Sequence, residues 1–225
     1  MGVQFSSLWF VVPLLVLLLV IAVVVAFTRR SLANGATVLT PRRLVEGYVF
    51  TVVLVAMLLV SSGLSDMLRA GIARYTGLQV SYRPTPVYEE SRKSSEEPKY
   101  EYDEKAPKRD LLTGTAQLGV GLIIGLLHLF GLRRLERTEP FITSPVYRVF
   151  LIVGLIIYTS AVLFFAVASV KDWLVYRYVE LPPMRSWYER PVPGEQIAGL
   201  IGYLPMWGLL VSRLFRYART KPTVS

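Results

Sequence analysis

The chain has no cysteine and a single histidine among its 225 residues. The absence of cysteine excludes disulfides, thiolate metal sites and cysteine nucleophiles. The sequence also lacks a glycine-rich phosphate loop, a nucleophile with a matching base, and paired carboxylates inside an apolar segment. These absences argue against an enzyme, and we predict no catalytic residues, no metal site and no cofactor.

The apolar segments also lack a water-facing side. Apolar residues make up 53% of the chain and fall in long unbroken runs rather than at alternating or helical spacing. About 20 apolar residues in a helix cross a hydrocarbon core of roughly 30 Å, and only helices or closed barrels satisfy their own backbone in lipid. The alternating segments of a barrel are missing. The sequence therefore predicts an all-α fold, a polytopic transmembrane helical bundle with about five spans.

The predicted spans are residues 8–27, 47–65, 111–132, 149–170 and 196–212. The first run could instead be a signal peptide, but it has no basic n-region and exceeds the usual apolar core of about 7 to 15 residues. The fifth run is shorter and contains Pro205. Membrane helices tolerate proline where neighbouring groups satisfy the freed carbonyl, so we expect a kinked span there.

Basic residues are concentrated in the segments that follow the first, third and fifth spans. Twelve of the 25 basic residues lie there beside only three acids (Glu46, Glu136 and Glu139): Arg29, Arg30, Arg42, Arg43, Arg133, Arg134, Arg137, Arg148, Arg213, Arg216, Arg219 and Lys221. Cytoplasmic segments concentrate Lys and Arg near span ends. We therefore expect a multi-pass protein of the cell membrane with its amino terminus outside and its carboxyl terminus in the cytoplasm.

The pattern divides the chain into four regions. Residues 1–80 form a first helix pair with an interfacial exit, where 66–80 places apolar residues among Arg69 and Arg74, like a short helix lying on the membrane. Residues 81–110 are polar and charged, which predicts a disordered external loop. Residues 111–180 form a second helix pair. Residues 181–225 comprise an external connector, the fifth span and a basic tail, and 171–187 is expected at the membrane surface.

An internal repeat relates the two predicted helix pairs. The Arg29-Arg30 pair and Thr40-Pro41 recur as Arg133-Arg134 and Ser144-Pro145, at an offset of 104 residues in both cases. Each repeat has an even number of spans, so the two repeats are parallel and one further helix follows them. Some transporters use parallel repeats, but duplication of a stable hairpin explains the pattern equally simply, and we favour it.

Several residues of the repeat share a further pattern. One helix type carries a Gly-Leu-Pro-x-Trp-like core with a basic exit, and it alternates with a helix opened by Arg and Tyr. The chain resembles, at these positions, an uncharacterised bacterial family of multi-pass membrane domains of unknown function. The resemblance implies a fold and no activity. The matching residues are Gly202, Pro205, Trp207, Arg213 and Arg216, then Gly125, Phe130, Arg133 and Arg134, and the openings Arg42, Arg43, Tyr48, Tyr147 and Arg148.

His128 is the one candidate for cofactor binding. Ionisable groups inside a membrane are costly and often functional, and ligation of a haem or chlorin is the specific hypothesis. A hydrogen bond from a neutral imidazole to a nearby carbonyl or hydroxyl is the simpler interpretation. We favour the simpler one, because no second ligand is evident in the chain.

Two further groups of residues suggest contacts rather than chemistry. Gly121 and Gly125 lie four residues apart and give the third span a small-residue face, for packing within the chain or, less favoured, for a homo-oligomer. The basic clusters orient the protein and would contact anionic lipid headgroups. The headgroup candidates are Arg29, Arg30, Arg42, Arg43, Arg133, Arg134, Arg213 and Arg216.

Three functions remain open. The first is a structural, accessory or assembly subunit of a membrane complex, with the lipid bilayer and other protein helices as partners and no nucleic acid. The second is a transporter or channel component, suggested by the repeat and Pro205. The third is a membrane cofactor carrier that uses His128. Polar side chains at mid-depth are scarce, which favours the first.

Overall fold

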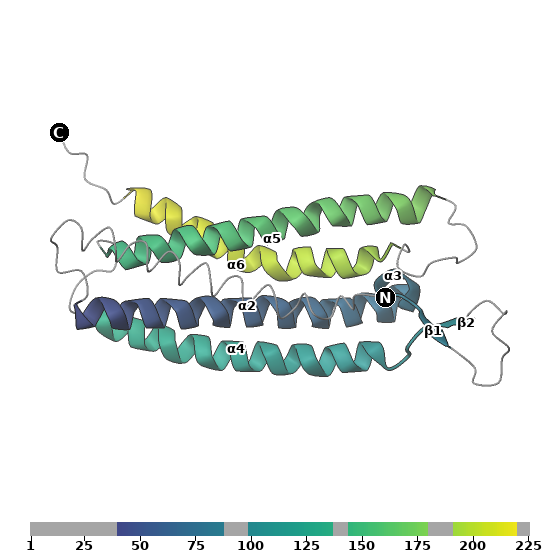
Figure 1. Ribbon diagram of the computed structural model, residues 1–225, viewed down its shortest axis with the longest axis horizontal. Coiled ribbons are helices and arrows are strands. Elements are labelled where there is room, and N and C mark those ends of the chain that lie inside the picture. Colours follow the sequence, from purple (N-terminus) through teal and green to yellow (C-terminus); the bar gives the residue numbers. More distant parts are fainter. Residues whose placement is uncertain (1–39, 88–98, 137–143, 180–190, 220–225) are drawn as a thin grey trace.

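The computed structural model describes residues 40–87, 99–136, 144–179 and 191–219. Four long helices run along the molecule (Figure 1): α2 (Pro41–Thr76), α4 (Ala106–Glu136), α5 (Pro145–Tyr178) and α6 (Pro193–Arg219). Three short elements join α2 to α4: helix α3 (Leu78–Ser81) and strands β1 (Thr85–Val87) and β2 (Lys99–Glu101). The predicted all-α helical bundle is confirmed. The first predicted span, 8–27, lies outside the described residues.

All four long helices are long and apolar enough to cross a membrane. They contain the second to fifth predicted spans and extend beyond each of them. The longest, α2, has 36 residues. At about 1.5 Å per residue it is longer than the roughly 30 Å of a hydrocarbon core. The helix ends therefore project past the apolar layer and carry polar groups outside it.

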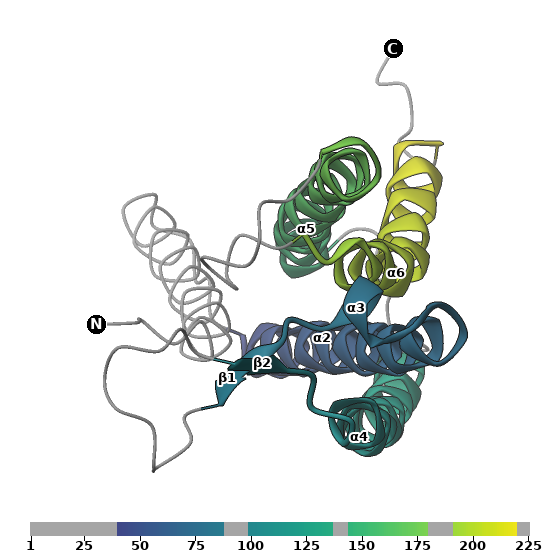
Figure 2. The same ribbon diagram turned by 90° about the vertical axis from the view of Figure 1, so that its right-hand side faces the viewer.

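The helices do not lie side by side in chain order. Viewed end-on, they follow the order α4, α2, α6, α5 (Figure 2), with α2 packed against both α4 and α6, and α5 mainly against α6. Over their described residues, α4 and α5 hardly touch each other. The structure thus differs from the predicted second helix pair at 111–180, because each of these consecutive helices packs against a helix elsewhere in the chain.

We name the two ends of the bundle by their contents. The hairpin end holds the ends of α2 and α5, the starts of α4 and α6, helix α3, and the antiparallel pair β1 and β2. The basic end holds the starts of α2 and α5 and the ends of α4 and α6 (Figure 1). Most described arginines near helix termini lie at the basic end.

The repeated Thr-Pro and Ser-Pro segments each open a helix. Pro41 and Pro145 occupy the first turns of α2 and α5, where a missing N–H costs no intrahelical bond. The Thr40 hydroxyl oxygen accepts a hydrogen bond from Arg43 N at 3.4 Å and caps α2. Ser144 makes no such cap and donates instead to Glu46. The repeat therefore preserves helix starts but not their side-chain contacts.

Glycines allow α2 and α4 to approach closely. A Cβ added at Gly121 would lie 2.9 Å from the Ala56 carbonyl oxygen, and one at Gly114 would lie 2.6 Å from that of Gly63. Gly125 is less tight, since its added Cβ would lie 3.4 Å from Ala56 Cβ. The small-residue face predicted at Gly121 and Gly125 thus faces α2 of the same chain.

Helix α6 is bent, and both views show the change of direction along it (Figures 1 and 2). Pro205 lies inside the helix and removes one backbone hydrogen bond, which is the usual cause of such a bend. In the first half, a Cβ at Gly202 would lie 2.9 Å from the Ser61 carbonyl oxygen. The straight N-terminal half of α6 can therefore lie close against α2.

Two predictions for the connecting segments are wrong. Residues 66–76 do not form a separate helix on the membrane surface but continue α2 to Thr76, because Arg69 there binds groups on α4 and α6. The predicted disordered loop at 81–110 contains β1, β2 and the start of α4 over its described part. The segment 171–187, predicted to lie at the membrane surface, continues α5 as far as Tyr178, and residues 180–190 lie outside the described part.

Candidate functional site

Polar side chains inside the bundle bind one another. The hydroxyl groups of Ser61 on α2 and Tyr158 on α5 lie 3.3 Å apart, and both side chains are fully buried. Nearby, Trp207 Nε1 on α6 donates to the Thr159 hydroxyl at 3.1 Å. In a hydrocarbon environment an unpaired polar group is costly, so these pairs hold α5 to both of its neighbours.

Aromatic rings surround the buried pair. The Tyr158 ring lies 5.7 Å from the Tyr203 ring, which lies 5.4 Å from Phe165, measured between centroids. Gly199 lets the Phe165 ring pack directly on the α6 backbone, since an added Cβ would lie 2.5 Å from it. The space between α2, α5 and α6 is therefore filled by side chains at this depth.

An ion-pair network lies at the hairpin end and centres on Arg69 of α2. Its guanidinium lies 3.7 Å from an Asp110 oxygen on α4 and 3.4 Å from a Glu195 oxygen on α6. Arg69 Nε also donates to the Ser81 carbonyl oxygen at 2.9 Å. One side chain thus ties together α2, α3, α4 and α6, which is why α2 continues beyond its apolar stretch.

Tyr82 completes this network from the segment after α3. Its ring lies 4.4 Å below the Arg69 guanidinium carbon, and its hydroxyl donates to Asp110 at 2.9 Å. Burial, together with this hydrogen bond, raises the pKa of Tyr82 above its usual value. The hydroxyl therefore stays protonated and serves as a hydrogen-bond donor.

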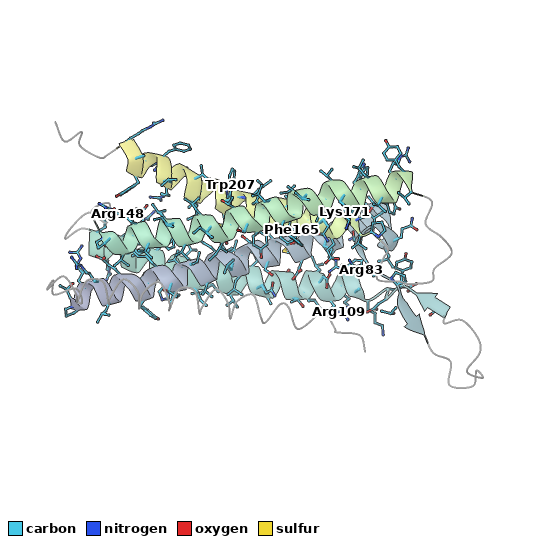
Figure 3. The ribbon with its side chains drawn as sticks, turned by 45° about the horizontal axis from the view of Figure 1, so that its top comes forward. Arg83, Arg109, Arg148, Phe165, Lys171 and Trp207 are labelled. Carbon is cyan, nitrogen blue, oxygen red and sulfur yellow. The ribbon has the colours of Figure 1, made fainter. Side chains whose placement is uncertain are left out.

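A cavity of about 270 Å³ opens beside the network. Its charged and aromatic side chains come from α2, from the segments before β1 and after β2, and from the starts of α4 and α6: Arg69, Tyr82, Arg83, Asp103, Arg109 and Glu195. Figure 3 shows Arg83 and Arg109 near each other at the hairpin end, far from Arg148 at the basic end. Charged side chains of both signs therefore line this cavity.

At the basic end, Glu46 is buried at 3% exposure although it is an acid. Arg42 Nε lies 3.0 Å from one carboxylate oxygen, and the Ser144 hydroxyl donates to the other at 2.6 Å. Ser144 immediately precedes α5. Glu46 therefore connects the starts of α2 and α5, and a neutral replacement would leave Arg42 and Ser144 without this acceptor.

Two other arginines at the basic end lie against aromatic rings. The guanidinium of Arg134 lies 5.0 Å from the Phe130 ring, and that of Arg148 lies 5.5 Å from the Tyr217 ring. The predicted headgroup residues Arg42, Arg43, Arg133, Arg134, Arg213 and Arg216 all gather at this end, on α2, α4 and α6. Arg29 and Arg30 lie outside the described residues.

The imidazole of the single histidine contacts groups on its own helix and on α2. His128 Nδ1 lies 2.8 Å from the Ile124 carbonyl oxygen one turn earlier on α4, and its ring lies 5.8 Å from the Tyr48 ring. Only Nε2 is left for another partner. In the described part of the chain, no three potential metal ligands gather anywhere. Cofactor ligation by His128 stays the less favoured hypothesis.

Sequence reasoning missed the Arg69 network and the cavity. Asp110, Glu195 and Arg69 are far apart in the chain, and each lies in a segment that the sequence assigned to the exterior. A possible signal was the run of charges immediately after an apolar segment, at Asp66 and Arg69, mirrored by Asp110 just before the next apolar segment. Both sets of charges would lie at the same membrane surface.

These features define the class of the protein as an integral membrane protein built on a bundle of transmembrane helices. Comparison with models of protein families, with curated proteins and with solved structures finds no match to this chain. The resemblance to a bacterial multi-pass family therefore stays a prediction, and function must be argued from the chain itself.

Proposed function

We propose that this protein is an accessory or assembly subunit of a membrane complex, without catalytic activity of its own. The observation that carries the proposal is the pairing of polar groups inside the bundle. Ser61 binds Tyr158 and Thr159 binds Trp207, so these groups satisfy each other instead of lining a path. A transport path needs polar groups that face one another across a hydrated space.

The outward faces of α4 and α5 support the same proposal. Only 11% of the most apolar stretch of α4 is buried in the bundle, against 50% for α2. The exposed face of α4 carries bulky apolar side chains such as Ile123, Leu127 and Phe130. Helices of a partner could pack on this face without displacing any contact that the bundle itself needs.

The orientation belongs to the proposal as well. The basic end would face the cytoplasm of a bacterial cell, with the hairpin end outside the plasma membrane. This rests on the arginines gathered at the starts of α2 and α5 and the ends of α4 and α6. Anionic lipid headgroups would contact these arginines at the inner surface.

Native mass spectrometry of the protein extracted in mild detergent tests the proposal. We expect a stoichiometric complex with at least one other membrane subunit, and loss of that subunit when Ile123 and Leu127 are replaced by Ala. Matched substitutions at Ile152 and Ile156, on the exposed face of α5, report whether the effect belongs to α4. A monomer or homo-oligomer alone would contradict the proposal, as would solute flux into proteoliposomes well above that into empty vesicles.

A further inference from the structure

The three arginines that line the cavity at the hairpin end differ in how the described part of the chain engages them. Arg69 is engaged by Asp110 and Glu195, and Arg109 Nη1 lies 3.4 Å from Asp103. Among the described residues, by contrast, no hydrogen bond or ion pair engages Arg83, and its Nε is buried. A buried N–H without an acceptor is unfavourable, and it indicates where an acceptor would bind.

The carboxylates around the cavity already accept hydrogen bonds from other groups of the protein. Asp103 accepts from Arg109 and from Lys105 N, and Glu195 accepts from Arg69. Asp110 accepts from Tyr82. Asp66, which also lies at this end of α2, does not line the cavity. An anion beside Arg83 would therefore meet carboxylates that are already compensated by a cation or a hydroxyl donor.

The donors facing the cavity suit a tetrahedral oxyanion. The Arg83 guanidinium offers a planar set of N–H groups, and Arg109 is 68% exposed, so it keeps N–H groups beyond the one given to Asp103. One guanidinium group can donate two parallel hydrogen bonds to two oxygens of the same phosphate, which a Lys ammonium cannot match in geometry. A volume of about 270 Å³ admits a phosphate group with a short substituent. It lies just below the roughly 300 to 1,000 Å³ of sites that hold drug-sized ligands.

The depth of the cavity matches the headgroup layer of a bilayer. The charge-free stretch of α2 ends at Ser65, and Arg69 lies one turn further along the helix, about 6 Å beyond it. The polar layer on each side of a bilayer is roughly 5 to 8 Å thick. Arg83 follows α3 at the same end of the bundle. Phosphodiester groups of lipids are therefore the phosphate source nearest to this cavity.

We propose that this cavity binds a phosphate oxyanion through Arg83, with Arg109 as the second donor. The ligand is the phosphodiester of a phospholipid headgroup or a soluble phosphate that reaches the same surface. This site is separate from the basic clusters at the opposite end of the bundle, and it does not depend on the accessory function proposed above.

Calorimetric titration of the full chain in a neutral, phosphate-free detergent tests the site. One arm uses a short-chain phosphatidylglycerol and the other uses inorganic phosphate. We expect one saturable site, and Arg83→Gln should weaken binding at least about tenfold, as loss of a charge-assisted hydrogen bond predicts. Arg83→Lys keeps the charge without the planar fork and should give an intermediate affinity.

Arg74→Gln is the matched control, because Arg74 is exposed on the last turn of α2 and does not line the cavity. Binding of the lipid alone, dependent on Arg83, assigns the site to headgroups, whereas comparable binding of inorganic phosphate assigns it to soluble phosphate. The proposal is overturned if neither probe saturates, or if Arg83→Gln and Arg74→Gln weaken binding equally. Unchanged thermal stability of the Arg83 variants shows that the loss comes from the site itself.

Discussion

The hydroxyl oxygens of Ser61 and Tyr158 lie 3.3 Å apart although 97 residues separate them in the chain. Both side chains are fully buried, so no water competes for this hydrogen bond. The helices that carry them, α2 and α5, also meet where the Phe50 ring stacks on the Phe150 ring, 4.9 Å apart between centroids, but each packs more extensively against α6 than against the other. The Ser61–Tyr158 pair is therefore a specific polar link between α2 and α5, the two helices that pack against α6.

Tyr158→Phe should lower the free energy of unfolding by about 1 kcal/mol, because it removes this hydrogen bond and keeps the ring. Reversible unfolding in mixed micelles measures the change. Tyr203→Phe is the matched control, since Tyr203 packs through its ring and no described residue accepts from its hydroxyl. Equal effects of the two substitutions would show that the Ser61 contact contributes nothing.

Gly121→Leu should destabilise the bundle by about 1 to 3 kcal/mol through overpacking. A Cβ at Gly121 already lies 2.9 Å from the Ala56 carbonyl oxygen, so a larger side chain would push α4 away from α2. Gly119→Leu provides the comparison, because nothing lies within 4 Å of a Cβ added there. The melting temperature in detergent should fall for the first variant only. A similar fall in both would place the cost in the helix itself rather than in its contact with α2.

Arg69→Gln should loosen the hairpin end and lower the free energy of unfolding by about 1 to 2 kcal/mol. It removes the ion pairs to Asp110 and Glu195 and the bond to the Ser81 carbonyl, but partial exposure limits the cost. Hydrogen exchange should rise in α3 and in the first turns of α4 and α6, while the basic end is unaffected. The control Arg74→Gln should not change hydrogen exchange at any position. A rise in exchange that is equal along the whole chain of the Arg69 variant would contradict a local role.

The absence of native cysteine makes the orientation directly measurable. Tyr75→Cys places a thiol at a position that is 89% exposed at the hairpin end, and Ala218→Cys places one on an exposed position at the basic end. A membrane-impermeant maleimide applied to intact cells should label the first and spare the second. Permeabilised cells should label both, which verifies that each thiol can react. The reverse pattern in intact cells would invert the proposed topology.

The helical spans and the starts of α2 and α5 could be predicted from the sequence. A run of apolar residues must match the hydrocarbon thickness, and Pro41 and Pro145 can begin a helix but rarely continue one. The close contact at Gly121 was also anticipated as a small-residue face. The sequence could not name its partner, because several helices could have approached it.

The ion pairs at the hairpin end could not be predicted from the sequence for a related reason. Segments rich in charge read as solvated surface, so 66–80 and 81–110 were assigned to an interfacial helix and a disordered loop. In the structure Arg69 forms ion pairs with Asp110 and Glu195. These ion pairs offset the conformational entropy that is lost when the end of α2 and the start of α4 become ordered. Long-range partners of this kind have no local signature.

The sequence by itself determined that this protein lies in a membrane and where its helices cross, since the length of an apolar run and the position of a basic cluster are local properties. Only the tertiary structure decided that α4 packs on α2, that α5 packs on α6, and that a cavity forms beside Arg83. The physical reason is that lipid and helix interfaces are both apolar, so a membrane helix carries no polar stripe to mark which face meets its neighbour.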